Sequence, residues 1–327
     1  MATNYSKPIV KTGPNLSLPS ESIDILKSMG FSCVTLANNH FRDFGYDACE
    51  NTLVLLQAKE IDYVGAGRNL ADAAKILYKY VNGVRVAFVN VCEQEWSIAT
   101  ETTPGSNPVN PLVQYNQIQE AKSNSDFVIV IHHGGIEHYQ LPSPELKRLH
   151  RFFIDVGADA VINHHQHCFS GYEVYRDRPI FYGLGNFIFD DSRKANSIWN
   201  YGYMVELNLD STEGGVSFKL YPYEQCNGFV GIKMRKDIDA FEHEVSDLNR
   251  IIADDELLKK SWRDYAERTE AFYSPAIIPF RSRVINKLIS MHLFPVAVSK
   301  YQMRYLCDVI RCDSHRTRFI EYLKDLI

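Results

Sequence analysis

The stretch "ADAVINHHQH", residues 158–167, joins a run of small and branched apolar residues to three histidines within four positions. An apolar run without polar alternation predicts a strand that is buried on both faces of its sheet. The histidines follow at the carboxyl end of that strand, where sites assemble in open α/β sheets. We therefore expect an α/β protein with a site at this edge; the alternative is that these imidazoles are only hydrogen-bonded structural residues.

The rest of the chain alternates between strand-like and helix-like segments. Apolar runs predict strands at residues 31–37, 84–93, 126–135 and 178–190. Helical spacing predicts helices at residues 20–30, 45–60, 116–125 and 143–157. Ser20 or Ser22 could cap the first helix, Gly30 ends it, and Pro144 suits the first turn of the last one. This order of elements predicts a sheet that is covered on both faces.

Composition excludes several classes of protein. The net charge of −5 and the pI near 6.1 argue against a nucleic-acid-binding surface. Seven scattered cysteines without a CxxC pair favour a reduced, cytoplasmic location, and the N-terminus lacks the apolar region of a signal peptide. The apolar segment 288–298 is too short to span a membrane.

Polar residues gather at three predicted strand ends. They are Asn38, Asn39 and His40; His132, His133 and Glu137; and His164, His165 and His167. An H-x-H pair on an extended segment would direct both imidazoles to the same side. Neutral imidazole together with amide or carboxylate oxygen suits Mn, Fe or Zn, and two such ions can clamp a phosphoryl group. The convergence of three strand ends favours a metal site over isolated structural histidines.

Five segments, in order and with similar spacing, resemble the CapA family of capsule and poly-γ-glutamate synthesis proteins. They are "FSCVTLANNHFRDFG", "GAGRNLADA", "VIVIHHGGIEHYQLPSPE", "GADAVINHHQHCFSGYEVY" and "RPIFYGLGNFIFD". The resemblance covers about residues 7 to 227. It implies a calcineurin-like metallophosphoesterase sandwich of helices packed on β-sheets, with two divalent metal ions.

The resemblance also implies roles for individual residues. Asn39, His133, His165 and His167 match metal ligands, and His40 matches a general acid or a group that contacts the transition state. His132 resembles a strand residue, and Cys168 a packing residue. Neighbours that would support the ligands or contact the substrate are Asn38, Asp43, Glu137, His164 and Asn186.

This chain departs from the family pattern at its beginning. Family members open with a strand that carries Gly-Asp and a second strand that ends in an acidic motif, and neither precedes "KPIVKTGPNLS" here. We expect the sheet to lack these first strands and the ion site to be poor in carboxylates.

Two regions are expected, a metallophosphoesterase-like domain at residues 1–229 and a helical region at residues 230–327 with helical spacing and many charges. The implied function is metal-dependent hydrolysis in capsule or poly-γ-glutamate synthesis, with a capsule polymer or phosphorylated precursor as partner. One alternative is a non-catalytic assembly or transport factor of a capsule-synthesis complex. Another is an unrelated enzyme with a single metal ion on the same strands.

Overall fold

The computed structural model describes two compact units, Met1–Lys259 and Lys260–Ile327. The described residues are 1–269, except 12, 190, 195–196, 213, 226–231 and 235–237, and then only 284, 287–288, 291, 293, 300–311 and 315. The expected boundary between residues 229 and 230 lies outside the described residues.

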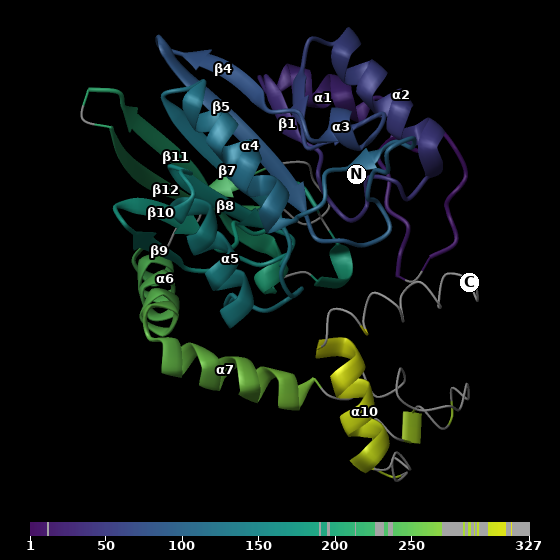
Figure 1. Ribbon diagram of the computed structural model, residues 1–327, viewed down its shortest axis with the longest axis vertical. Coiled ribbons are helices and arrows are strands. Elements are labelled where there is room, and N and C mark those ends of the chain that lie inside the picture. Colours follow the sequence, from purple (N-terminus) through teal and green to yellow (C-terminus); the bar gives the residue numbers. More distant parts are fainter. Residues whose placement is uncertain are drawn as a thin grey trace. The chain divides into compact units, whose positions relative to one another are not determined.

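The first unit is built on a six-stranded sheet with the strand order β4-β5-β7-β8-β10-β9 (Figure 1). The bounds are β4 Leu77–Val81, β5 Val84–Cys92, β7 Phe127–His133, β8 Ala160–His164, β9 Tyr172–Tyr175 and β10 Arg178–Phe181. The four strands β5, β7, β8 and β10 run parallel, and β4 and β9 are antiparallel edge strands. The carboxyl ends of the parallel strands therefore meet at one edge of the sheet, as the sequence predicts.

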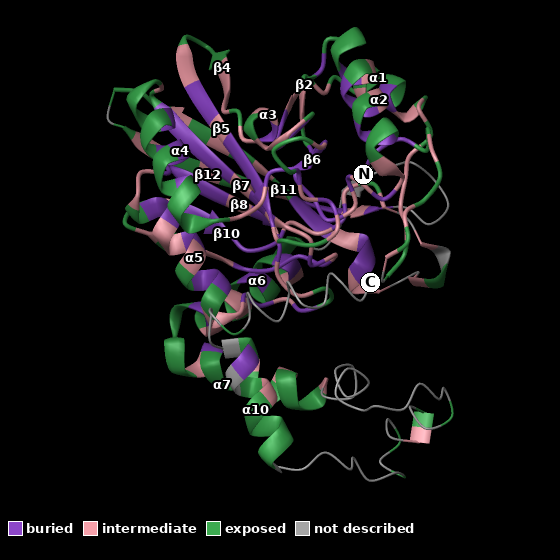
Figure 2. Cartoon of the chain, turned by 45° about the vertical axis from the view of Figure 1, so that its right-hand side comes forward, coloured by how far each residue is buried: buried purple, intermediate pink, exposed green. Residues whose placement is uncertain are grey.

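Two helices cover one face of this sheet, α4 (Pro111–Ser123) and α5 (Pro144–Asp155) (Figure 1). Each begins after a side-chain cap, since Asn110 Oδ1 accepts from Leu112 N and Ser143 Oγ accepts from Leu146 N. Each also has a proline in its first turn, where no backbone hydrogen bond is lost. The buried strands and the exposed outer helix faces are seen in Figure 2.

A second sheet covers the other face, so that the unit is a sandwich. It contains β11 (Tyr201–Asp210), β12 (Gly215–Gln225) and β13 (Ile232–Met234) in that order, all antiparallel. Leu207 and Leu209 of β11 pack against Val86, Phe127 and Ile129 of the central sheet. The predicted α/β class with both faces covered is confirmed.

Smaller elements complete the first unit. They are α1 Ser22–Ser28, β1 Cys33–Thr35, α2 Gly45–Ala58, β2 Asp62–Val64, β3 Ala66–Gly67, α3 Leu70–Ala73, β6 Gly105–Ser106, η1 Ser192–Lys194 and η2 Ile198–Asn200. β1 and β2 form a parallel pair against which α2 buries Leu53 and Leu56. The expected side-chain cap of α1 is wrong, because its N-cap is Glu21 and makes no side-chain cap bond. Gly30 follows that helix at φ +84°, as a helix-ending glycine should.

Helices follow the second sheet, as helical spacing predicts. The helix α6 (Ile238–Ala253) packs Phe241 and Val245 against Phe169 and Tyr203. It is followed by α7 (Asp255–Arg268), and the second unit contains α10 (Lys300–Arg311). Among the residues described, no helix is long and apolar enough to cross a membrane. Most of the apolar segment 288–298 lies outside them.

Candidate functional site

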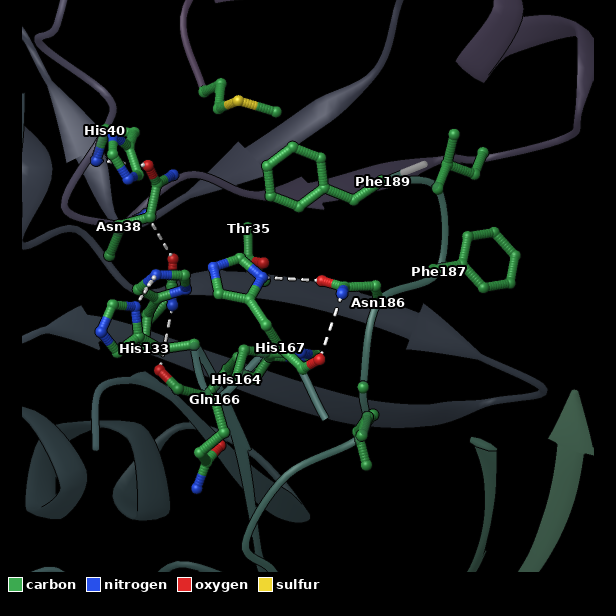
Figure 3. A pocket seen from close by; sticks show the side chains of 18 of the residues that line it. Thr35, Asn38, His40, His133, His164, Gln166, His167, Asn186, Phe187 and Phe189 are labelled. Atoms are coloured by element: carbon green, nitrogen blue, oxygen red, sulfur yellow. Dashed lines mark hydrogen bonds between the residues drawn. The ribbon is translucent and has the colours of Figure 1, made fainter. Parts of the chain in front are cut away.

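A cavity of about 600 Å³ opens at the carboxyl edge of the central sheet (Figure 3). It is lined by the predicted site residues Asn38, Asn39, His40, His133, His164, His165, His167 and Asn186. They come from the turn after β1, from the end of β7, from the end of β8 and the segment after it, and from the loop after β10. The structure thus brings residues from all three strand ends into one cavity, but His132 and Glu137 are not among its lining residues.

Three donor atoms form the centre of the site. His133 Nε2 lies 3.2 Å from Asn39 Oδ1 and 3.2 Å from His165 Nδ1. Asn39 is oriented by its amide nitrogen, which donates to Glu95 Oε2 at 3.3 Å and so directs its oxygen toward His133. An amide oxygen and two imidazole nitrogens thus face one another.

The two histidines of the H-x-H pair are not on an extended segment, so that expectation is wrong. The strand β8 ends at His164, and His165 and His167 have positive φ angles of 104° and 56°. Such angles are strained for residues other than glycine and cluster at functional sites. The His165 ring therefore contacts His133, whereas His167 Nδ1 lies 2.8 Å from Asn186 Oδ1.

Burial keeps these imidazoles neutral. It lowers the pKa of His133 well below its usual value, lowers that of His165, and lowers that of His167 to about 4. His164 is affected in the same way, with its pKa lowered to about 4. Neutral imidazoles have a free nitrogen lone pair at physiological pH, which a metal ion requires.

The spacing of the central donors fits a metal ion. Ligand atoms 2.0–2.2 Å from one ion, as around zinc, are separated by roughly 3 Å, close to the two 3.2 Å distances at His133. Two neutral imidazoles and an amide oxygen also suit a borderline divalent ion. In the described part of the chain, however, no group of three or more His, Cys, Asp or Glu residues is placed to hold a metal. The three central donors are one amide oxygen and two imidazole nitrogens, so none of them is a carboxylate.

His40 is held by a buried ion pair. Its Nδ1 lies 2.6 Å from Asp43 Oδ2, and Lys11 Nζ lies 2.6 Å from Asp43 Oδ1. Burial raises the pKa of Asp43, but the hydrogen bonds with His40 and Lys11 outweigh it and leave that pKa below its usual value. A charged Asp43 fixes the ring of His40, which lines the cavity. Lys11 was not among the predicted site residues.

The other expected neighbours differ in position. Asn38 Oδ1 accepts from His40 N at 3.0 Å and so shapes the turn. Asn186 contacts His167 directly, and its Nδ2 also donates to His167 O and to Trp199 O. Glu137 is exposed and is not among the cavity-lining residues.

Two acids near the site were not predicted, Glu93 and Glu95. Glu95 Oε2 accepts from Asn39, and Glu93 Oε1 accepts from Gly135 N at 2.9 Å. Burial raises the pKa of Glu93. Both follow β5 directly, so the strand-end rule that identified the histidines would also have identified them.

Comparison with known proteins identifies the family of this chain. Residues 1–191 match the family model described as bacterial capsule synthesis protein PGA_cap, which is more than half of the chain. The chain belongs to this family.

Two relatives and one solved structure extend the comparison. The chain is 40% identical to the capsule biosynthesis protein CapA of Bacillus anthracis over 57% of this chain and 46% of that protein. It is 39% identical to the PGA biosynthesis protein CapA of Bacillus subtilis over 54% of this chain and 47% of that protein. The chain thus spans about half the length of these curated relatives. A phosphatase from Mycoplasma pneumoniae matches with a TM-score of 0.44 and 15% identity over 67% of this chain and 80% of that one, too distant for an argument.

Proposed function

We propose that this protein is a metal-dependent hydrolase that acts on a phosphoester, or a related bond, in a capsule polymer or its phosphorylated precursor. The observation that supports the proposal is the contact of Asn39 Oδ1, His133 Nε2 and His165 Nδ1 at ligand spacing. These atoms would hold one divalent ion, Mn, Fe or Zn. His167 is assigned to a second ion through Nε2, because its Nδ1 already contacts Asn186.

An ion bound there would act as a Lewis acid toward an oxygen of the reacting group. The protein's own contribution comes from His40. Since Asp43 accepts a hydrogen bond from His40 Nδ1, the proton to be transferred is on Nε2. Asp43 keeps its negative charge because Lys11 forms an ion pair with it, so the ring of His40 keeps its orientation during proton transfer. His40 is thereby placed to protonate a leaving oxygen.

The names of the relatives suggest the substrate. One relative is named for capsule biosynthesis and the other for PGA biosynthesis, so the proposed substrate is an anionic polymer of that kind or a precursor of it. A second candidate is a non-catalytic accessory factor in the same synthesis. Because none of the three central donors is a carboxylate, the proposed ion would be held weakly, which favours this candidate.

Metal analysis combined with an activity assay distinguishes the two. The full chain is loaded with Mn, Fe or Zn, and its bound metal and its hydrolysis of an aryl phosphate and of poly-γ-glutamate are measured. A hydrolase binds metal and turns over one of the substrates, and His165→Ala loses both properties. Metal binding without turnover supports the accessory factor, and failure to bind any of the three ions contradicts the hydrolase.

A further inference from the structure

A cation lies beside the site on an aromatic platform. Lys194 Nζ is 3.4 Å from the ring centroid of Trp199 and 3.4 Å from His138 Nε2. The His167 ring stacks on the same indole, with centroids 4.6 Å apart and an interplanar angle of 21°. One tryptophan therefore supports both a proposed metal ligand and an ammonium group.

The ammonium has no carboxylate at salt-bridge distance among the described residues. The nearby Asp191 is already engaged by Arg193, whose Nε and Nη2 donate to its two oxygens at 2.9 Å. Because an ammonium group can only donate, His138 Nε2 accepts the hydrogen bond from Lys194 Nζ. An ammonium has three donors, and Lys194 uses one on His138. The others remain for a ligand.

The two residues whose rings Lys194 contacts are each held by a hydrogen bond. His138 has a φ of +62°, and its N–H donates to Gln166 O at 2.7 Å. Trp199 is 5% exposed, and its indole N–H donates to Phe189 O at 2.6 Å. Lys194 thus rests on two ordered residues, and it lies next to the cavity because His167, which lines the cavity, stacks on the same indole.

We propose that Lys194 and His138 form an oxyanion-binding subsite that holds a carboxylate or phosphate group of the substrate next to the histidine cavity. The subsite rests on the proposed function only for the identity of the substrate, because the binding of an anion can be measured without turnover. A polymer with an acidic group on every unit would place one such group here while a neighbouring unit enters the cavity.

Binding can be followed at Trp199 itself. Glutarate and inorganic phosphate are titrated separately into the full chain at constant ionic strength, and the indole N–H signals of Trp96, Trp199 and Trp262 are recorded by NMR. The Trp199 signal, assigned with Trp199→Phe, is expected to shift while the other two do not. A response to glutarate alone identifies a carboxylate subsite, and a response to phosphate alone identifies a phosphate subsite.

Variants decide whether Lys194 is responsible. Lys194→Met should weaken binding about tenfold, as expected for loss of a charged hydrogen bond, and Lys194→Arg should restore most of it. Lys219→Met is the matched control, because Lys219 also lies over an aromatic ring, that of Tyr221, but on β12. It should bind like wild type. Glu137→Gln should tighten binding, since it removes a negative charge beside His138.

Asn39→Ala separates anion binding from metal binding. This variant should lose the metal ion, but its Trp199 signal should still shift when the anion is added. The proposal is overturned if wild type shows no Trp199 shift with either anion. It is also overturned if Lys194→Met binds as tightly as wild type, or if Lys219→Met weakens binding equally. If Lys194→Met does not fold, two other variants test the proposal. Lys194→Gln should weaken anion binding, and Glu137→Gln should tighten it.

Discussion

Two consecutive histidines at the end of β7 have opposite environments. His133 faces the cavity and contacts Asn39 and His165, whereas His132 is fully buried, with its Nδ1 3.1 Å from His150 Nε2 of α5. His150 in turn stacks on Tyr182 with an interplanar angle of 15°. Because side chains alternate along a strand, adjacent identical residues face different surroundings. One pair of rings is thus available for a ligand and the other is part of the core.

The largest difference between His132 and His133 should appear in metal binding. His133→Ala removes the donor atom that contacts both other donors, so metal content should fall by more than the roughly 10- to 100-fold typical for loss of an outer-sphere partner. His132→Gln should retain the metal and lose about 1–3 kcal/mol of unfolding free energy, because a buried partner of His150 is altered. Elemental analysis and urea unfolding measure the two effects. Equal metal loss in both variants would remove the distinction.

His40 provides the next largest effect. His40→Ala should lower turnover by roughly 100- to 10,000-fold while leaving metal content nearly unchanged, since it contacts Asp43 rather than the central donors. Steady-state kinetics on the metal-loaded chain, together with elemental analysis, test this. A His40 variant that loses its metal as His133→Ala does would show that His40 is a ligand.

The buried pair should make stability depend on pH. Burial lowers the pKa of His132 to about 4 and that of His150 well below its usual value, whereas both titrate near 6.5 in the unfolded chain. The unfolded chain then binds more protons, so stability is full above pH 6.5 and is lost as the pH falls toward 4. The lowered pKa of His132 alone accounts for roughly 3 kcal/mol of this loss of stability.

Urea unfolding at pH 7 and at pH 4.5 measures this loss. His150→Phe keeps the stacking on Tyr182 and removes one titrating base, so its stability should depend less steeply on pH than that of wild type. An identical pH dependence in the variant and in wild type would contradict the assignment.

The smallest effect is expected at His164, the last residue of β8. It lines the cavity, yet in the described part of the chain its side chain makes no hydrogen bond to the central donors. His164→Gln should therefore change metal affinity less than about threefold, well below the loss expected for an outer-sphere partner. Isothermal titration with Zn or Mn checks this, and a loss as large as that of His165→Ala would make His164 a ligand.

The elements that the sequence predicted well are those with a simple local pattern. Continuous apolar runs predicted β5, β7 and β8, and helical spacing predicted α2, α4 and α5. The hairpin β11–β12 was not predicted, although residues 205–210 alternate between apolar and polar side chains as a strand covered on one face does. That pattern could have been identified without the structure.

Other features depend on tertiary structure. Glu95 is 56 positions from Asn39 and Lys11 is 32 positions from Asp43, and neither contact follows from local spacing. His165 and His167 have positive φ angles, so they do not form the extended segment that the H-x-H prediction assumed. Both rings nevertheless line one cavity. Convergence at strand ends was predictable because the topology of parallel strands determines it; the contacts of each ring were not.

The central claim is that Asn39, His133 and His165 hold one divalent ion. Crystals of the full chain grown with Mn or Zn, with anomalous diffraction recorded at the metal edge, test this claim most directly. The predicted result is an anomalous peak about 2.0–2.2 Å from Asn39 Oδ1, His133 Nε2 and His165 Nδ1. An anomalous peak at any other position would contradict the claim. So would a structure at saturating metal in which the three donor atoms contact one another and no ion lies between them.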